Sequence, residues 1–363
     1  MAQRIIHQFT EGAFVGDATS DQVFMIQRWL QDLGFISEVY AEQSHPELAG
    51  VTHPVGDYRP HRDEEYILHH HAIGSSIAER IKTIALPQIL VYHNITPAEF
   101  YAHSNPTLAL YLDKGRDQLV EMVPRTALAL GASRYNEAEL IEAGFSPTGT
   151  LPIVLDESAF AQPLNEALAE QCRAMRPLIL FVGRMAPNKR QEDLLKLHYY
   201  LRRIAPHAHL VLVGNTGDRE YVDWQEQMVK ELRLDNSSVR VAGHVSHQDM
   251  LTYYRCADVY VSMSEHEGFG KPLIESMYCG LPVVAYASSA VPETMGDAGI
   301  LFYEKDYEAL AELVNILVRD EELRRRIIAR QTARAQDFLE PQVRRQFEAY
   351  LRQLGLLPAG SLS

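Results

Sequence analysis

The chain has 363 residues, 46% of them hydrophobic and 23% charged, which is the composition of a globular protein long enough for two domains. With 48 Asp and Glu against 34 Lys and Arg, its net charge of −14 argues against nucleic acid as a partner, because binding a polyphosphate needs clustered cations. The three cysteines have no C-x-x-C spacing, which excludes a disulfide framework and indicates a reducing compartment. Since the sequence shows no signal-peptide pattern and no run of about 18 apolar residues, we expect a cytoplasmic protein without a membrane span.

Acidic residues are concentrated in the first half of the chain. Residues 1–171 contain 10 Lys/Arg and 23 Asp/Glu, a net charge of −13, whereas residues 172–363 contain 24 and 25, a net charge of −1. A polar, helical connector from Asn165 to Ala174 lies at this change. We therefore predict an N-terminal domain over 1–171, a second domain over 172–336, and a closing helical segment over 337–363.

Short β-branched runs alternate with longer amphipathic runs in both halves. The strands expected in the first half are Arg4–Phe9, Ile36–Tyr40, Glu65–His69, Gln88–His93 and Ala127–Leu130. Those expected in the second half are Leu178–Val182, Ala208–Val213, Val239–Ala242, Val259–Met263 and Pro282–Ala285. Helical patterns lie between them, as at Asp21–Leu33, Gln191–Ile204 and Asp249–Cys256. This alternation predicts a doubly wound parallel sheet in each half, with ligands bound beyond the carboxyl ends of the strands.

Two of the loops after strands carry residues suited to an anionic ligand. Arg184 and Lys189 follow the strand that ends near Gly183, where a guanidinium and an ammonium would suit a diphosphate; two solvated surface cations are the alternative. The second loop, SEHEGFGKP, contains Glu267 and leads into a helix that contains Glu275. The start of that helix offers N–H groups to a phosphate, and carboxylates accept hydrogen bonds from sugar hydroxyls. A capped helix with two surface carboxylates is the alternative here.

Three motifs, in this order along the chain, resemble one enzyme family. The segments VGRMAPNKR, SEHEGFGKPLIESMYCGLPVVAY and AVPETMGDAGILF resemble the retaining nucleotide-sugar glycosyltransferases of family 4, whose E-x7-E motif matches Glu267 and Glu275. VYHNITPAEFY and SRYNEAELIEAGF match more loosely. The resemblance implies the GT-B fold, in which two Rossmann-like doubly wound domains face each other across a cleft. It also implies that the closing helices cross back to the first domain.

The resemblance assigns a role to individual positions. Arg184 and Lys189 match the cations that neutralise the donor diphosphate, Glu275 the carboxylate that binds the ribose, and Glu267 the one that contacts the donor sugar. His93 matches a histidine that faces the transferred sugar, although hydrogen bonding to neighbouring backbone explains this histidine equally well. The other donor-binding positions are Gly12, Gly16, Gly183, His244, Val245, Phe269, Gly270, Lys271 and Leu273.

Two of these regions depart from the family pattern. Family members often have adjacent glycines after the first strand, but here Gly12 and Gly16 are separated. We expect Asp17 in this loop to meet an acceptor hydroxyl, and Ser20 or Asp21 to cap the next helix. Lys271 stands where an apolar residue is common.

The leading hypothesis is retaining transfer of a hexose from a GDP- or UDP-sugar to a glycan acceptor in bacterial surface polysaccharide synthesis, with a lipid-linked glycan as the expected acceptor. We expect no cofactor and no metal, because the cations and the helix start would stabilise the leaving group. Alternatives are a sugar-nucleotide epimerase, a synthase of a small disaccharide, and an inactive nucleotide-sugar-binding protein. A nicotinamide dehydrogenase is disfavoured, since no G-x-G-x-x-G follows the first strand.

Two further features have less specific interpretations. His69, His70 and His71 end an expected strand, and we favour packing or lining of the cleft over a metal site. The helix that contains Lys114 and Arg116 also contains Asp113, Asp117 and Glu121, so we expect weak or no binding to anionic membranes and at most peripheral contact.

Overall fold

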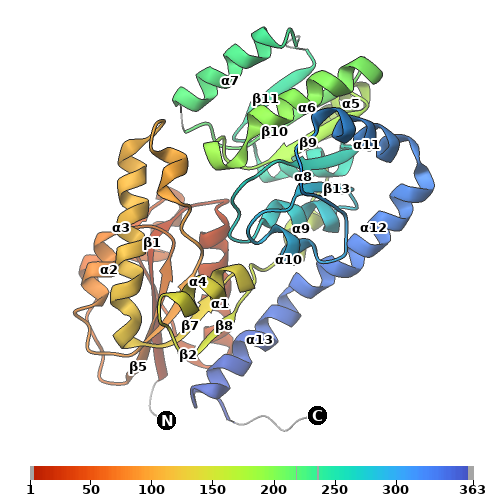
Figure 1. The fold of residues 1–363 in the computed structure, drawn as a ribbon. Coiled ribbons are helices and arrows are strands. Elements are labelled where there is room, and N and C mark those ends of the chain that lie inside the picture. The colour runs from red at the N-terminus through yellow and green to blue at the C-terminus, as the bar shows by residue number, and fades with distance from the viewer. Residues whose placement is uncertain (1–3, 218, 235–236, 359–363) are drawn as a thin grey trace. The chain divides into compact units, whose positions relative to one another are not determined.

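The computed structural model describes residues 4–217, 219–234 and 237–358, which form two compact units (Figure 1). Unit 1 contains the chain up to Ala102, then Pro106–Val154, and the segment from Glu340 onward. Unit 2 contains His103–Asn105 and Leu155–Leu339. Among the described helices, none is both long and apolar enough to cross a membrane.

The boundary between the units lies before the one expected at residue 172. Helix α5 (Glu166–Ala174) belongs to unit 2, where its N-cap Asn165 donates from Nδ2 to Asp249 at 2.8 Å and from its backbone N–H to Thr252 Oγ1 at 2.9 Å. At the other end, unit 1 resumes at Glu340 rather than at residue 337.

The contrast in charge between the halves mostly disappears when the compact units are compared. Unit 1 contains 13 Lys/Arg and 21 Asp/Glu, a net charge of −8, and unit 2 contains 21 and 27, a net charge of −6. The cut at residue 172 had placed the acidic segment 155–171 with the first half and the arginines of the last helix with the second. The interpretation of an acidic first domain beside a nearly neutral second one was therefore wrong.

Unit 1 is built on a fully parallel, eight-stranded sheet of order β4-β3-β1-β5-β6-β7-β8, with β2 also paired to β1. Its strands are β1 (Arg4–Ala13), β2 (Phe35–Ile36), β3 (Val39–Ser44), β4 (Thr52–Pro54), β5 (Glu64–His71), β6 (Gln88–Tyr92), β7 (Thr126–Gly131) and β8 (Thr148–Thr150). Its helices are α1 (Ala18–Asp32), α2 (Ser76–Ile81), α3 (Pro106–Met122), α4 (Arg134–Glu142) and α13 (Glu340–Gln353).

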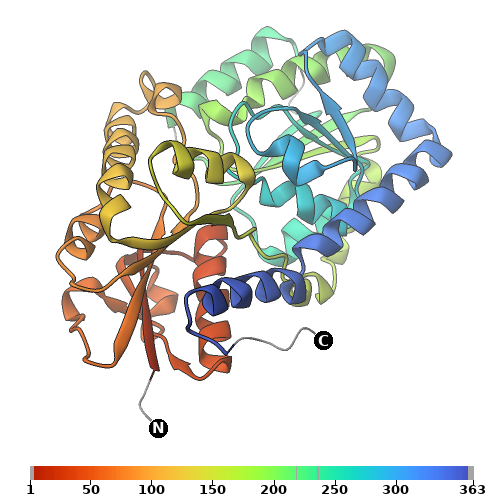
Figure 2. The same ribbon diagram turned by 60° about the horizontal axis from the view of Figure 1, so that its bottom comes forward.

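Each face of this sheet has its own apolar cluster, because side chains alternate along a strand. Ile6 and Leu68 point to the face covered by α1 and α13, and Figure 2 shows these two helices side by side. Phe9 and Ile67 point to the opposite face, which α2 covers. Trp29 of α1 packs on Phe347 of α13, with their ring centroids 5.8 Å apart, and donates to Glu340 at 2.8 Å.

Unit 2 contains a parallel six-stranded sheet of order β11-β10-β9-β12-β13-β14. Its strands are β9 (Leu178–Val182), β10 (His209–Val213), β11 (Val239–Gly243), β12 (Val259–Ser262), β13 (Val283–Tyr286) and β14 (Ile300–Phe302). Its other helices are α6 (Gln191–Ile204), α7 (Arg219–Glu231), α8 (His247–Cys256), α9 (Lys271–Tyr278), α10 (Val291–Met295), α11 (Tyr307–Arg319) and α12 (Glu321–Ala335).

Both sheets confirm the predicted doubly wound parallel architecture. In each sheet, the strand order reverses between two neighbouring strands. These are β1 and β5 in unit 1, and β9 and β12 in unit 2. Such a switch point opens a crevice at the carboxyl ends of the strands, where ligands bind in folds of this kind. Sequence patterns identified the long strands, but they missed the short strands β4, β8 and β14 and merged β2 with β3.

Candidate active site

The switch point of unit 2 brings together the two loops that the sequence singled out. The loop after β9 contains Arg184 and ends in the 3-10 helix η6 (Pro187–Lys189), and the loop after β12 contains Glu267. Asn188 joins these loops, because its carbonyl accepts from the Glu265 N–H at 2.9 Å and its side chain donates to the carbonyl of His266 at 3.1 Å. The side chain of Arg184 is exposed.

Lys189 and Glu267 form an ion pair with 2.7 Å between Nζ and Oε2, and their side chains are only 17% and 15% exposed. The cation expected for the diphosphate and the carboxylate expected for the sugar therefore neutralise each other. A nucleotide-diphosphate sugar offers both of them new partners, a phosphate for Lys189 and hydroxyls for Glu267.

The backbone of Glu267 is fixed from the loop after β13. Ser289 Oγ accepts from the Glu267 N–H at 2.7 Å and donates to the Glu267 carbonyl at 2.9 Å. The Ala290 N–H also donates to that carbonyl, at 3.2 Å. Sequence analysis did not identify Ser289 as a support for Glu267.

The start of α9 differs in part from the expected phosphate cradle. Gly270 is the N-cap of α9, and Phe269 is buried, with its carbonyl accepting from Thr294 Oγ1 at 2.6 Å. The Leu273 N–H donates to the Gly270 carbonyl at 2.9 Å, so the group predicted to bind a phosphate is already hydrogen-bonded within the loop. Pro272 has no N–H to offer, so a phosphate at this helix start would depend on other donors.

Glu275 is buried within α9 and has two neighbours that orient its carboxylate. The hydroxyl of Tyr254, from α8, donates to Oε2 at 2.7 Å, and Lys271 Nζ lies 3.7 Å from Oε1. Lys271 therefore faces the predicted ribose-binding carboxylate. Sequence analysis did not identify Tyr254, because it lies 21 residues before Glu275 and no local pattern connects them.

Hydrogen bonds join the loops after β9, β10 and β11. The Gly183 N–H donates to the Val213 carbonyl, and the Gly214 N–H to the Gly243 carbonyl, each at 2.9 Å. A Cβ on Gly214 would lie 1.9 Å from the Gly183 carbonyl oxygen, so only glycine allows this approach. The predicted donor-binding positions His244 and Val245 follow Gly243, with His244 exposed and Val245 half-buried.

A network of charges around the buried Asp193 supports the loops after β9 and β12. Asp193 at the start of α6 is 1% exposed and accepts from Lys305 at 2.7 Å and from Lys196 at 2.9 Å. Lys305 also contacts Glu265 of the β12 loop, at 2.8 Å. Burial acts to raise the pKa of Asp193, but these lysines and the Tyr307 hydroxyl lower it to about 2. The network keeps Asp193 ionised and holds the two loops in register.

In unit 1, the positions predicted around the first loop have different roles. Gly12 lies inside β1 rather than after it, and Gly16 lies in the turn before α1. Asp17, expected to meet an acceptor, is the N-cap of α1 and accepts from both the backbone N–H and the hydroxyl of Ser20, at 3.0 and 3.1 Å. The prediction that Ser20 or Asp21 caps this helix was therefore wrong.

His93 follows β6 and belongs to a chain of three side chains. Its Nε2 lies 2.9 Å from Nδ1 of His70, whose Nε2 lies 2.8 Å from Oε1 of Gln8. Because a Gln carbonyl oxygen can only accept, His70 donates to Gln8 and accepts from His93. This leaves Nδ1 of His93 as an acceptor, and burial lowers the pKa of His93 to about 4. The two motifs that matched the family more loosely also meet in unit 1, because the side-chain amide of Asn94 donates to Oδ1 of Asn136 at 3.0 Å.

Residues 165–334 match the protein family described as "Glycosyl transferases group 1". The chain is 32% identical over 160 residues to O-antigen chain mannosyltransferase B of Escherichia coli, covering 44% of this chain and 41% of that protein. It is 28% identical over 204 residues to GDP-mannose-dependent alpha-(1-6)-phosphatidylinositol monomannoside mannosyltransferase of Mycolicibacterium smegmatis, covering 52% of each. The chain thus spans about half or less of the length of these relatives.

Solved structures match almost the whole chain. Anabaena Alr3699/HepE in complex with UDP and glucose matches with a TM-score of 0.73 and 19% identity, covering 97% of this chain and 100% of that one. Sucrose-phosphate synthase from Thermosynechococcus elongatus matches with a TM-score of 0.75 and 19% identity, covering 97% and 99%. At this identity the likeness establishes the GT-B fold. Residues 165–334 are therefore similar to the glycosyl transferases group 1 family, within a chain of GT-B fold.

Proposed function

We propose that the chain transfers a hexose from a nucleotide-diphosphate sugar to a glycan acceptor with retention of anomeric configuration. The observation that carries this proposal is the Lys189–Glu267 pair at the switch point of unit 2, beside the start of α9. GDP-mannose is the first donor to test, because two of the relatives are named as GDP-mannose-dependent. UDP-glucose is the second, because HepE was crystallised with it.

In the proposed reaction, Arg184 and Lys189 bind the diphosphate and stabilise its charge as it leaves, with no metal or cofactor at the phosphates. Lys189 exchanges its ion pair with Glu267 for a phosphate oxygen, and Glu267 turns to hydroxyls of the sugar. Glu275, held by Tyr254, binds the ribose. The acceptor oxygen attacks the anomeric carbon on the face that the diphosphate leaves. A bond from that oxygen to carbon forms, the carbon–oxygen bond to the phosphate breaks, and the acceptor proton passes to the leaving phosphate oxygen.

We propose that unit 1 binds the acceptor, with His93 facing the transferred sugar and contributing an acceptor nitrogen at Nδ1. A lipid-linked glycan of surface polysaccharide synthesis is the acceptor class that the relatives' names favour, since one is an O-antigen mannosyltransferase and another acts in capsular polysaccharide biosynthesis. Any membrane contact would be peripheral, and unit 1, with a net charge of −8, would be repelled by anionic lipid.

The donor is identified first by thermal shift with GDP-mannose, UDP-glucose and an ADP-sugar, because a ligand that binds the folded state raises its melting temperature. Mass spectrometry of products with and without glycan acceptors then separates the alternatives. Transfer to an acceptor with retention supports the proposal. Conversion of the donor without any acceptor would indicate an epimerase, and binding without turnover on any acceptor an inactive binding protein.

The site is tested with Arg184→Ala and Glu267→Ala, each expected to lower the transfer rate by about 100-fold or more. Lys230→Ala removes an exposed lysine of α7 in the same unit and is the matched control, expected to keep the wild-type rate. Wild-type rates in both site variants would contradict the assignment.

A further inference from the structure

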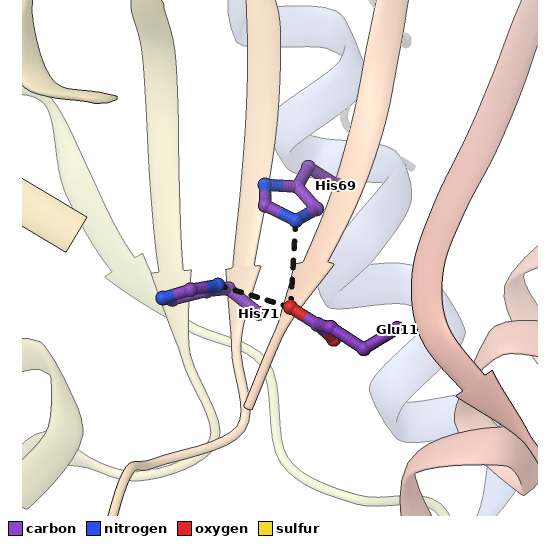
Figure 3. A group of neighbouring side chains, drawn as sticks. All are labelled: Glu11, His69 and His71. Carbon is purple, nitrogen blue, oxygen red and sulfur yellow. Dashed lines mark hydrogen bonds and ion pairs between the residues drawn. The ribbon is translucent and has the colours of Figure 1, made fainter. Parts of the chain in front are cut away.

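Two histidines and a glutamate meet at the switch point of unit 1, on the face of the sheet that α2 covers. Glu11 lies near the end of β1, and His69 and His71 lie at the end of the neighbouring strand β5. Because side chains alternate along a strand, residues 9 and 11 of β1 and residues 67, 69 and 71 of β5 share this face, and His70 points to the other one. Figure 3 shows His69 and His71 pointing at the same carboxylate oxygen of Glu11.

The three groups are close together and nearly inaccessible to solvent. Oε1 of Glu11 lies 3.0 Å from Nδ1 of His71 and 3.6 Å from Nε2 of His69. The histidine side chains are 0% exposed and that of Glu11 is 10% exposed. One nitrogen or oxygen atom from each residue lies within 4.8 Å of the other two.

The hydrogen bonding of His71 calls for a positive charge at this point. Its Nε2 lies 2.9 Å from the carbonyl oxygen of Gly115 in α3, and a carbonyl can only accept, so Nε2 carries a hydrogen. In a neutral ring, Nδ1 then has a lone pair directed at the Glu11 carboxylate, which is repulsive. Either a second proton on His71 or a cation between the two groups removes this conflict.

The backbone around Gly115 is arranged so that this carbonyl reaches His71. A Cβ on Gly115 would lie 2.6 Å from the Gly74 nitrogen and 2.9 Å from the Ile73 carbonyl carbon, so a glycine is required for α3 to pack this closely. A histidine that donates one ring N–H to a backbone carbonyl has its other nitrogen fixed for a metal ion, which is how most metal-binding histidines are oriented.

His69 distinguishes a metal ion from an extra proton on His71. Both of its ring nitrogens are buried, and neither has a hydrogen-bond partner among the described residues. A proton on His71 would satisfy the pair with Glu11 but would leave His69 as it is. A cation placed between the three groups would also give Nε2 of His69 a partner, and leaving a buried polar group without one costs about 1–3 kcal/mol.

We propose that Glu11, His69 and His71 bind one divalent transition-metal ion, with zinc as the first candidate. Two imidazoles and a carboxylate form a ligand set that zinc uses, with bonds of about 2.0–2.2 Å that place adjacent ligand atoms roughly 3.0–3.5 Å apart. The distances of 3.0 and 3.6 Å from Glu11 lie close to this range. Nitrogen ligands favour zinc, cobalt and nickel over magnesium and calcium, and three protein ligands leave a position for water or for a hydroxyl of a bound molecule.

This proposal departs from the expectation from sequence, which favoured packing or lining of the cleft over a metal site for His69, His70 and His71. His69-x-His71 places two imidazoles on one face of a strand, but their third partner lies on another strand, 58 residues earlier in the sequence. The proposal concerns unit 1 and is independent of the metal-free departure of the diphosphate proposed for unit 2.

The test uses the full-length protein without an affinity tag, stripped by a chelator and then titrated with Zn²⁺ or Co²⁺. We expect about one tightly bound ion per chain by elemental analysis and calorimetry, a higher melting temperature with Zn²⁺, and the visible absorption of tetrahedral or five-coordinate Co²⁺. No stoichiometric binding of either ion to the wild-type protein would overturn the proposal, and that result is independent of transferase activity.

His69→Leu is the most informative variant. It removes one ligand at similar volume and also removes two unpartnered buried nitrogens, so we expect the metal-free variant to be at least as stable as the wild type. Metal affinity should fall by at least roughly 100-fold, because changes to outer-shell groups alone cost 10–100-fold. Glu11→Gln should have a similar effect, and His207→Leu, at an exposed histidine of unit 2, should have none. Unchanged metal affinity in His69→Leu and Glu11→Gln would show that the ion binds elsewhere.

Discussion

The two units have the same strand order around their switch points, but they place charged groups there in different ways. In unit 2, Lys189 and Glu267 lie on loops beyond the strands and are 17% and 15% exposed. In unit 1, Glu11, His69 and His71 belong to the strands themselves, and their side chains are 0–10% exposed. Groups held on loops can exchange partners with a large ligand. Groups held on strands have fixed directions and suit a ligand no larger than an ion.

The units also differ in what supports these groups. The loops of unit 2 are held by the network around Asp193. In this network the carboxylates of Asp193 and Glu265 are paired with lysines. The cluster of unit 1 contains a histidine, His69, whose two buried ring nitrogens have no hydrogen-bond partner among the described residues. The comparison therefore contrasts a site with a complete internal ion pair and a site for which we propose a bound metal ion.

The largest expected effect is on Lys189. Lys189→Ala removes a positive charge from the leaving diphosphate and leaves Glu267 without its partner, so the transfer rate should fall by about 100- to 1,000-fold. The measurement is kcat with the donor identified by thermal shift. The double variant Lys189→Ala with Glu267→Ala should lose less than the product of the two single losses, because paired groups do not act additively. If the loss of rate in the double variant equalled the product of the two single losses, Lys189 and Glu267 would act independently and their ion pair would have no role in transfer.

The next effect is on the stability of unit 2. Asp193→Asn leaves Lys305 and Lys196 facing a neutral amide in a buried position, which should lower the free energy of unfolding by about 3 kcal/mol. Urea denaturation measures this. Asp223→Asn, whose ion pair with Arg219 is exposed, should change stability by less than about 1 kcal/mol. If the two substitutions lowered the free energy of unfolding equally, the buried network would contribute no more to stability than an exposed ion pair does.

Acid should destabilise unit 1 before unit 2. Burial lowers the pKa values of His7 and His93 from 6.5 to about 4, so the unfolded chain binds more protons than the native one between these values. Stability therefore falls as the pH drops from 7 to 5, by about 2 kcal/mol for each histidine. The lowered pKa of Asp193 has its effect only below about pH 4, as that carboxylate is protonated in the unfolded chain. Hydrogen exchange read by mass spectrometry should show that unit 1 opens faster at pH 5 than at pH 7, after correction for the intrinsic exchange rate, and that unit 2 does not. An equal loss of protection in both units would refute this.

The smallest expected effect concerns Tyr254. Tyr254→Phe removes the hydroxyl that holds Glu275, so the KM for the donor should rise by roughly tenfold with little change in kcat. Tyr253→Phe, at the adjacent and equally buried position, is the control. A fall in kcat with an unchanged KM would mean that Glu275 acts on the reacting bond rather than on binding.

The sequence predicted the doubly wound sheets because continuous apolar runs and amphipathic helices are local patterns. Leu178–Val182 and Gln191–Ile204 were predicted with the bounds that the structure has. The three-residue strands β4, β8 and β14 have no such pattern, because too few side chains alternate to show a period. The helix α5 was predicted, but its place in unit 2 was not, since this depends on contacts of Asn165 with residues more than 80 positions away.

The sequence by itself determined the fold class and the family likeness of unit 2, because the spacing of residues within one strand, loop and helix is a local pattern. It also placed Lys189 and Glu267 in loops after strands, and Glu275 in the helix that follows the second loop. Only the tertiary structure decided which groups pair with one another: Lys189 with Glu267, Tyr254 with Glu275, and Glu11 with His69 and His71. These partners come from separate elements, and parallel strands place residues side by side through register, which no local pattern contains.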